Sequence, residues 1–200
     1  MQLGFLASHN GSSMRAILTA IERQALQANG AVLISNNPQS GAIKAAMDAG
    51  IPAFCFNKAR CGSEAAVDEA IVSTLQKHQV DTVILSGYMK RIGPKTLHAY
   101  HQRILNIHPS LLPQFGGEGM YGIHVHTAVL AAGVKETGAT VHLVNEVYDK
   151  GEILGQVRVP VLAGDTPDVL QARVAKEEGP LYVQVLRQWS QTQARSTFPK

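Results

Sequence analysis

The first hundred residues alternate short apolar runs with segments of helical periodicity, and this alternation restricts the fold more than any other feature. Strands are predicted at residues 2–7, 31–35, 52–56, 82–85 and 103–107, and helices at 14–28, 41–49, 63–78 and 93–100. Strands that alternate with helices are typical of crossover units, which build a parallel sheet. The strands are short and continuously apolar, as expected where helices cover both faces of a sheet. The sequence therefore predicts an α/β protein.

The second half of the chain departs from this alternation. Its predicted elements are a loop with four glycines at 115–122, a short helix at 125–132, strands at 137–144 and 153–159, and a long helix at 166–189. The two strands flank a turn at Asp149–Gly151 and are expected to be antiparallel. Pro180 is expected to kink or split the long helix, and residues 190–200 to form a loose tail. The expected fold is thus a Rossmann-like, mostly parallel twisted sheet with helices on both faces and antiparallel additions in the C-terminal part.

Length, charge and cysteine content exclude several classes of partner. A chain of 200 residues fits one domain, and a net charge of +3 without a run of Lys or Arg does not favour a nucleic-acid surface. It is compatible with an anionic small substrate. No apolar run approaches the roughly 18 residues of a membrane helix, and no basic-then-apolar leader precedes the first strand. Cys55 and Cys61 match no zinc or redox motif, so we expect a cytoplasmic protein without a membrane partner.

The loop between the first predicted strand and the first helix has the features of an anion site. Asn10, Gly11, Ser12 and Ser13 lie where free backbone N–H groups and the helix dipole favour negative charge. Gly11 permits a positive φ or the close approach of a ligand, and the serines add hydroxyl donors. The loop matches neither Gly-x-Gly-x-x-Gly nor the P-loop pattern. Ordinary helix capping by Asn and Ser explains the same residues, so both interpretations stay open.

A second polar pair follows a strand in the middle of the chain. Asn106 and His108 are two residues apart, so on a strand they share one face. They lie at the carboxyl end of the sheet, where open parallel sheets bind ligands. An amide donor beside an imidazole is suited to stabilising an oxyanion, and Pro109 and Pro113 stiffen the loop that follows. A capping Asn and a partly exposed His at a strand end are the alternative explanation.

The residues from Asn106 to Pro113, NIHPSLLP, resemble the signature of the folate-dependent formyltransferases. Three further segments are similar to that family: Asn10–Ser13, the loop for a substrate phosphate; Gly87–Ile92, which borders the folate pocket; and Gly138–Val144 followed by Asp149–Gly151, the second active-site segment. The four matches occur in the order of the family and cover nearly the whole chain. Ordered matches are much more specific than any single motif.

The resemblance assigns roles to residues of this chain. It implies catalytic Asn106, His108, His142 and Asp149; phosphate-binding Asn10, Gly11, Ser12 and Ser13; Gly87 and Glu178 beside the substrate amine and ribose; and folate-binding Leu85, Met89, Lys90, Arg91, Ile92 and Val144. It implies no metal. It also implies one domain over residues 1–189, with a phosphate-binding half at about 1–100 and a catalytic, folate-binding half at about 101–189.

The activity that the resemblance implies is transfer of a formyl group from 10-formyltetrahydrofolate, the co-substrate, to the amine of glycinamide ribonucleotide in purine biosynthesis. Asn106 and His108 would donate to the tetrahedral oxyanion. Asp149 would favour the protonated form of His108 and relay a proton through water. Members that formylate tRNA and members that are deformylases carry additional domains, which 200 residues do not accommodate. A formyltetrahydrofolate deformylase, or transfer to another phosphorylated amine, is the alternative.

Departures from the family pattern bear on these expectations. Ser13 stands where the phosphate loop commonly has Asn, and Gly179 where a His follows the matched Glu. Folate contacts in the family are largely with backbone atoms, which makes Lys90 and Arg91 acceptable in that segment. The glycine-rich segment 115–122 is longer than usual, and a surface excursion is favoured over a mobile flap above the substrate.

Two other classes of function are distinguished by later observations. His108, His124, His126 and His142 could supply ligands to a metal hydrolase, since a His-x-His spacing can chelate on a strand. A non-catalytic nucleotide-binding module would keep the phosphate loop but would not need a donor pair and a carboxylate together. The expected partners are small-molecule substrates, with no nucleic acid, and the expected state is a monomer or a homodimer.

Overall fold

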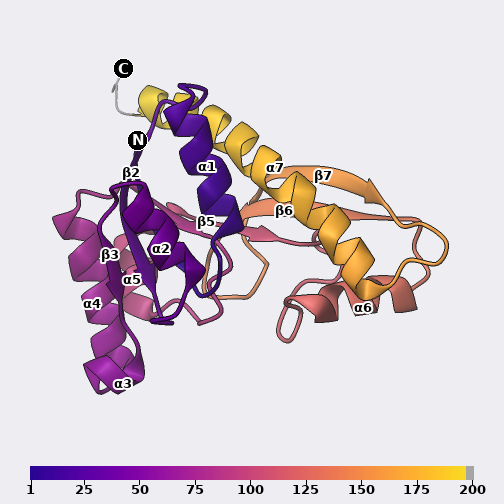
Figure 1. The fold of residues 1–200 in the computed structure, drawn as a ribbon, viewed down its shortest axis with the longest axis horizontal. Helices are drawn as coiled ribbons and strands as arrows, with labels where there is room; N and C mark the ends of the chain where they lie inside the picture. Colours follow the sequence, from indigo (N-terminus) through magenta and orange to yellow (C-terminus); the bar gives the residue numbers. More distant parts are fainter. Residues whose placement is uncertain (197–200) are drawn as a thin grey trace.

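One mixed sheet organises the chain. The computed structural model describes the backbone of residues 1–196 and the side chains of residues 1–191. The described residues form a seven-stranded sheet in the order β3-β2-β1-β4-β5-β6-β7 (Figure 1). The strands are β1 (Gln2–Ala7), β2 (Asn29–Ser35), β3 (Ala53–Cys55), β4 (Thr82–Leu85), β5 (Ile104–His108), β6 (Glu136–Leu143) and β7 (Ile153–Pro160). Strands β1 to β5 are parallel, whereas the pairs β5–β6 and β6–β7 are antiparallel.

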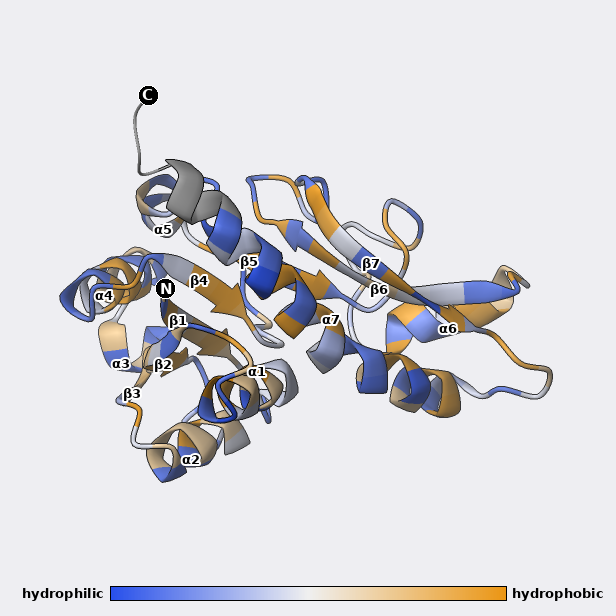
Figure 2. Cartoon of the chain, turned by 90° about the horizontal axis from the view of Figure 1, so that it is seen from above, coloured by the Kyte–Doolittle hydropathy of each residue, from blue (hydrophilic) through white to orange (hydrophobic). Residues whose placement is uncertain are grey.

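Helices cover both faces of this sheet. One face packs α1 (Ser12–Glu22), α2 (Gly41–Asp48), α6 (Ile123–Ala131) and α7 (Pro167–Ser196), and the other packs α3 (Lys58–Cys61), α4 (Glu64–Lys77) and α5 (Pro94–Ala99). Helix α7 contacts α1, α6, β6 and β7, and Figure 1 shows it running obliquely across that half of the molecule. Figure 2 shows hydrophobic residues along β4 in the interior and hydrophilic residues on the outer faces of the helices.

Strand β1 illustrates why the sheet is buried on both sides. Leu3 and Phe5 join the core that α1 and α7 cover, while Leu6 points the other way into the core that α4 covers. All three side chains are fully buried. A strand with two covered faces has a continuous apolar sequence, which is the pattern that predicts parallel strands. The expected α/β architecture with an antiparallel C-terminal addition is confirmed.

Some boundaries differ from the sequence-based expectation. The first helix ends at Glu22 rather than at residue 28, because Gln24 adopts a left-handed conformation with φ 57°. The N–H groups of Ala25 and Leu26 then both bond to the Ala20 carbonyl and close the helix end. Helix α3 is not predicted from the sequence. It is a single short turn, capped by the side chain of the residue that precedes it.

The C-terminal helix also differs from the expectation. Pro180 does not split α7, which continues to Ser196, past the predicted start of the tail at Ser190. The preceding Gly179 lies so close to α1 that a Cβ there would come within 2.6 Å of the Ala16 Cβ. This close packing holds the segment although proline removes one helical hydrogen bond. Residues 197–200 of the predicted tail lie outside the described residues, and none of the described helices is long and apolar enough to cross a membrane.

Candidate active site

The start of α1 presents unpaired backbone donors at the carboxyl end of β1. Gly11 precedes the helix with φ 61°, and a Cβ there would lie 2.9 Å from a side chain of α2, so glycine is required. The N–H groups of Ser12 and Ser13 have no hydrogen-bond partner among the described residues. The next N–H, of Met14, donates to Ser86 Oγ at 3.0 Å. Free N–H groups at a helix N-terminus attract anions, so this loop can hold a phosphate.

Capping by the loop itself, the other explanation of its sequence, does not apply. No side chain of the loop caps α1; Asn10 and Ser12 are exposed and Ser13 is buried. The Arg15 side chain anchors the loop, because Nε donates to the Asn10 carbonyl at 3.1 Å and Nη2 donates to the Gly41 carbonyl at 3.0 Å. The loop is therefore fixed through its backbone, and its first N–H groups stay available.

Ser8 links this loop to the segment predicted to bind folate. Its buried hydroxyl donates to Asn36 Oδ1 at 2.5 Å and accepts from the Met89 N–H at 2.7 Å. The Ser8 N–H donates to the carbonyl of Gly87, which has a positive φ of 69° and open space around it. The phosphate loop and residues 87–89 therefore form one hydrogen-bonded edge. Neither Ser8 nor Asn36 is predicted from the sequence, although the place of Ser8 directly after a strand is a usable signal.

Four polar side chains converge where β5 and β6 meet. Asn106 and His108 share one face of β5, and the antiparallel register places His142 opposite Asn106. The Asn106 Nδ2 and His142 Nε2 atoms are 3.1 Å apart. Asp149, from the β6–β7 loop, places Oδ2 3.5 Å from His108 Nδ1 and Oδ1 3.4 Å from His142 Nε2. The structure thus brings together the four residues that the sequence resemblance assigns to catalysis.

Backbone geometry directs Asp149 into this cluster. Its φ is 55°, a left-handed conformation that Asp tolerates better than most residues. The Gly117 N–H donates to Oδ2 at 2.9 Å. At Gly151 a Cβ would collide with the Leu143 carbonyl, so the loop folds back tightly onto β6. The side chain of Asp149 is only 10% exposed, which strengthens its electrostatic interaction with the histidines.

Two backbone carbonyls fix the tautomers of the histidines. His142 Nδ1 lies 2.8 Å from the Leu143 carbonyl, and His108 Nε2 lies 2.8 Å from the Phe115 carbonyl. Because a carbonyl only accepts, each of these nitrogens carries a proton. In a neutral ring the other nitrogen accepts, so His142 Nε2 receives one N–H of the Asn106 amide. His142 therefore orients the amide of Asn106 and leaves its second N–H for a ligand.

Burial controls the protonation of His108. Burial lowers the pKa of His108 and outweighs Asp149 and the Phe115 carbonyl, both of which raise it. The positive charge of a protonated His142 would lower it further. Asp149 thus favours the protonated form of His108, but burial acts more strongly in the other direction, because removing the ring from water penalises its charged form.

The carboxyl group of Asp149 responds in the opposite way to its surroundings. Burial raises the pKa of Asp149, whereas the His142 ring beside it and the hydrogen bond from the Gly117 N–H lower it. The charges of His108 and His142 add to this lowering. The net pKa lies below its ordinary value, so Asp149 is ionised at neutral pH. The cluster therefore combines an ionised Asp149 with a His108 ring whose pKa is lowered by burial. A second negative charge beside the ring, such as an oxyanion, would raise the pKa of His108.

The start of the glycine-rich loop, residues 115–117, belongs to the site. The interpretation of this loop as a surface excursion does not predict that. The Phe115 carbonyl accepts from His108, and the Gly117 N–H donates to Asp149. Phe115 reaches this position with a positive φ of 54°, for which the sequence gives no signal. Further along, Tyr121 is 53% exposed at the surface. The loop is therefore part of the site at its beginning and a surface excursion only beyond it.

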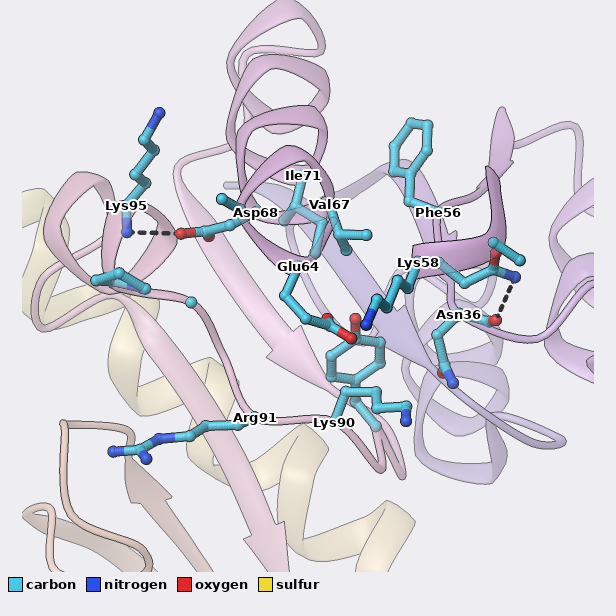
Figure 3. A pocket seen from close by; sticks show the side chains of 16 residues that line it. Asn36, Phe56, Lys58, Glu64, Val67, Asp68, Ile71, Lys90, Arg91 and Lys95 are labelled. Atoms are coloured by element: carbon cyan, nitrogen blue, oxygen red, sulfur yellow. Dashed lines mark hydrogen bonds between the residues drawn. The ribbon is translucent and has the colours of Figure 1, made fainter. Parts of the chain in front are cut away.

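Three of the residues predicted to bind folate, Lys90, Arg91 and Ile92, line a cleft. Leu85 and Ile92 are buried, Val144 is half-buried, and Met89, Lys90 and Arg91 are exposed. A cavity of about 620 Å³ is lined by Lys90, Arg91 and Ile92 together with Leu97 and Glu146. A second cavity, of about 580 Å³, shares the exposed part of this segment and extends to the N-terminal end of α4 (Figure 3). The first cavity includes Glu146 of the loop that carries Asp149, whereas none of the four residues of the cluster lines either cavity.

Glu178 lies on α7 and does not touch the cluster. It is half-buried, burial raises the pKa of its carboxyl, and it has no hydrogen bond or ion pair among the described residues. One turn further on, the Tyr182 hydroxyl lies 2.8 Å from the Leu105 carbonyl and 3.2 Å from the Leu85 carbonyl. These contacts fix α7 against β4 and β5. Glu178 thus carries an unpaired carboxyl group among the described residues, on a helix, α7, that is bonded to β4 and β5.

The His-x-His pair considered as metal ligands, His124 and His126, does not lie on a strand, as chelation at this spacing would require. His124 and His126 lie on α6, and one is exposed while the other is buried, so they point in different directions. His126 Nδ1 is buried without a partner. Among the side chains that the structure describes, no group of three His, Cys, Asp or Glu residues is placed to hold a metal ion.

The sequence model of the family described as formyl transferase matches residues 1–186. This chain belongs to the formyl transferase family. The match includes both the loop at the start of α1 and the cluster between β5 and β6. The four segments that resemble the folate-dependent formyltransferases are thus parts of one family match.

Several formyl transferases are similar over most of this chain. Phosphoribosylglycinamide formyltransferase, chloroplastic, of Vigna unguiculata is 44% identical over 185 residues, which are 92% of this chain; the chain spans 59% of that relative's length. Phosphoribosylglycinamide formyltransferase of Bacillus subtilis strain 168 is 38% identical over 182 residues, 91% of each protein. The crystal structure of glycinamide ribonucleotide transformylase 1 from Symbiobacterium toebii has a TM-score of 0.90 and 36% identity, and the match covers 96% of this chain and 88% of that one.

Proposed function

We propose that this formyl transferase moves the formyl group of 10-formyltetrahydrofolate to the amine of glycinamide ribonucleotide in purine biosynthesis. The observation that carries the proposal is the cluster of Asn106, His108 and Asp149, which lies in the same chain as a helix N-terminus with free N–H groups. Relatives named for this acceptor support it, including one that matches this chain over 91% of both lengths. A module that only binds nucleotides would not need the cluster.

The phosphate loop holds one end of the ribonucleotide. Its phosphate accepts from the N–H groups of Ser12 and Ser13, at the positive end of the α1 dipole. The open backbone at Gly87 leaves room for the amine end of the substrate. Glu178, which lacks a partner within the described residues, accepts from the ribose hydroxyls. Binding through these groups places the amine beside the donors of β5.

The co-substrate occupies the cleft beside Lys90, Arg91 and Ile92. Apolar surface at Leu85 and Val144 packs against its ring system. Backbone groups of the segment after β4 form hydrogen bonds with the polar atoms at the edge of the ring system. This arrangement directs the formyl carbon toward Asn106. Holding both reactants in one orientation removes much of the entropic barrier of a two-substrate reaction.

The chemistry follows from where charge develops. The amine lone pair attacks the formyl carbon, a C–N bond forms, and the C=O electron pair moves to oxygen. The second N–H of Asn106 donates to that oxygen, and so does His108 when it is protonated. The low pKa of His108 in the free protein is consistent with this step, because a negative oxygen beside the ring favours the imidazolium form.

Collapse of the intermediate breaks the bond between the formyl carbon and the folate nitrogen. The attacking amine loses a proton, and the departing nitrogen gains one. Asp149 holds a water molecule that passes this proton between the two nitrogens. The depressed pKa of Asp149 keeps it as a carboxylate, which can accept from that water. No covalent bond to the protein is required.

We further propose that the enzyme acts in the cytoplasm on small molecules alone, as a monomer or a homodimer. Cys55 and Cys61 are both free thiols, which suits a reducing compartment. The half-buried state of both side chains is consistent with thiols that serve packing rather than chemistry.

A spectrophotometric assay tests the reaction directly. Purified protein is mixed with 10-formyltetrahydrofolate, with and without glycinamide ribonucleotide, and loss of the formyl group from folate is followed. We expect turnover that requires the ribonucleotide. Turnover without it would identify a deformylase instead, and turnover only with a different phosphorylated amine would replace the acceptor.

A further inference from the structure

Arg91 bridges two segments that flank the co-substrate cleft. It lies between β4 and α5, and Figure 3 shows its side chain extending away from that of Lys90. Its Nη2 donates to the Glu146 carbonyl at 3.3 Å, and its Cζ lies 5.7 Å from the centre of the Tyr148 ring. Both partners belong to the β6–β7 loop, and Tyr148 is directly followed by Asp149. Arg91, which lines the cleft after β4, is thus bonded to the β6–β7 loop, which lines the same cleft through Glu146.

The loop has few other anchors at this point. Residues 145–148 are all exposed, with Val147 at 59% and Tyr148 at 48%. The Val147 N–H bonds to Asn145 Oδ1, and the Val147 carbonyl accepts from Lys150, so these bonds remain inside the loop. In the described part of the chain, Arg91 is the only residue outside the loop that hydrogen-bonds to residues 145–148.

The position of Asp149 depends on how this loop is held. A left-handed conformation costs more for Asp than an extended or helical one, so the surroundings must impose the observed φ of 55°. On the far side of the site, the Gly117 N–H holds the carboxylate. On the near side, the residues just before Asp149 are held by Arg91. Removing the second contact would leave residues 145–148 without a hydrogen bond to any described residue outside the loop.

We propose that Arg91 is a positioning residue that clamps the β6–β7 loop through Tyr148 and thereby sets Asp149 against the two histidines. The inference rests on the proposed function, because it assigns Arg91 to the same reaction. A guanidinium suits the task, since its plane can cover an aromatic ring while an edge donates to a carbonyl. Arg91 reaches no reacting atom through this contact and acts through the loop, beside any contact that it makes with folate.

Tyr148 offers the cleaner test, because Arg91 is itself expected to contact the co-substrate. Tyr148→Leu removes the ring, whereas Tyr148→Phe keeps a ring for the guanidinium and serves as the matched control. We expect faster backbone hydrogen exchange over residues 144–151 in Tyr148→Leu and parent-like exchange in Tyr148→Phe. We also expect kcat to fall about 2- to 5-fold in Tyr148→Leu, the factor that an exposed cation–π contact represents, with an unchanged KM for the ribonucleotide.

A double substitution identifies the partner. Arg91→Met should increase exchange in the same residues, and adding Tyr148→Leu to it should increase exchange no further, because the guanidinium that the ring contacts is already absent. Parent-like exchange in Tyr148→Leu would overturn the clamp. Faster exchange with an unchanged kcat would overturn its part in positioning Asp149. If glycinamide ribonucleotide is not the acceptor, the proposed function fails, while the exchange difference between the Leu and Phe variants still decides whether Arg91 holds the loop.

Discussion

His108 and His142 lie on neighbouring strands, and each has one ring nitrogen bonded to a backbone carbonyl. Their second nitrogens both face Asp149, but only that of His142 also receives the Asn106 amide. A ring that accepts from an amide fixes a donor, whereas a ring beside a carboxylate can gain a proton when negative charge develops. Two residues of the same type therefore have different expected effects when they are replaced.

His108→Ala should lower kcat by roughly 100- to 1000-fold, as removal of an oxyanion donor typically does. The KM for the ribonucleotide should change little, because the phosphate is bound at the start of α1. Steady-state kinetics measures both quantities, and far-UV circular dichroism checks the fold. His124→Ala, at an exposed position of α6, is the control and should keep parent activity. A near-normal kcat in His108→Ala would remove this residue from the mechanism.

Asp149→Asn removes the negative charge of the side chain while it keeps the backbone conformation of residue 149. Asn tolerates a positive φ as Asp does, and its amide oxygen can still accept from the Gly117 N–H. The fold should therefore persist, while kcat should fall by about 100-fold or more because the proton relay is lost. Asp149→Ala should be equally inactive and should also melt at a lower temperature. Substantial turnover in the Asn variant would show that the negative charge is not needed.

At the scale of elements, the change from parallel to antiparallel pairing between β5 and β6 builds the cluster. Parallel β5 ends in Asn106-Ile107-His108, and antiparallel β6 lays His142 beside it in register. Helix α1 starts from the end of β1, two strands away from β5 in the sheet. The anion loop and the cluster are therefore set by different pairs of elements, and they can be impaired separately.

Gly11→Val should impair the anion loop alone. The left-handed conformation and the 2.9 Å approach to α2 both exclude a branched side chain. We expect the KM for the ribonucleotide to rise roughly 10- to 100-fold, which corresponds to losing hydrogen bonds to a charged group. The KM for the co-substrate should stay near that of the parent, and a melting curve should show that the fold survives. An unchanged KM for the ribonucleotide would show that phosphate binds elsewhere.

The sequence predicts helices and strands well where the local spacing of apolar residues determines them. It predicts less well which side chains come into contact. The shared face of Asn106 and His108 follows from a period of two along β5. The pairing of Asn106 with His142 depends on strand register, which no local pattern specifies. The bond from His108 to the Phe115 carbonyl involves a backbone atom in an unusual conformation, and the lowered pKa of His108 depends on burial in three dimensions.

At the scale of the whole molecule, two buried imidazoles connect the site to stability. Burial lowers the pKa of His108 and of His126. The positive charge of a protonated His108 would lower the pKa of His126 further, and that of a protonated His142 would lower the pKa of His108 further. Both rings lie in the half of the molecule where α6 and the β5–β6 pair meet. Protonation of either ring in the folded state is unfavourable, so the unfolded chain binds these protons more readily.

Acidification below about pH 6.5, the ordinary pKa of His, should therefore destabilise the protein. Between that pH and the lowered folded-state pKa values, the unfolded state holds more protons, so the free energy of unfolding falls as pH falls, by at most about 1.4 kcal/mol per pH unit for each ring. The depressed pKa of Asp149 acts in the same direction at lower pH, because its stabilisation is lost as pH falls from 3.8 through its folded-state pKa.

Urea midpoints measured from pH 7.5 down to pH 5 check this expectation. His126→Leu removes a buried ring with an unpaired nitrogen, so its stability should depend less steeply on pH than that of the parent. A stability that rises on acidification, or an unchanged slope in His126→Leu, would contradict the assignment.

The order of strands in the sheet also has a consequence for how the chain becomes active. Strands β1 to β5 can pair as soon as the first half of the chain is available, since each lies beside another of that half. The β6–β7 hairpin joins at one edge, and it brings His142 and the loop with Asp149. In a refolding mixture, a chain that has ordered only its first five strands lacks His142 and the loop with Asp149 and is chemically silent, so the return of catalysis marks the arrival of the hairpin.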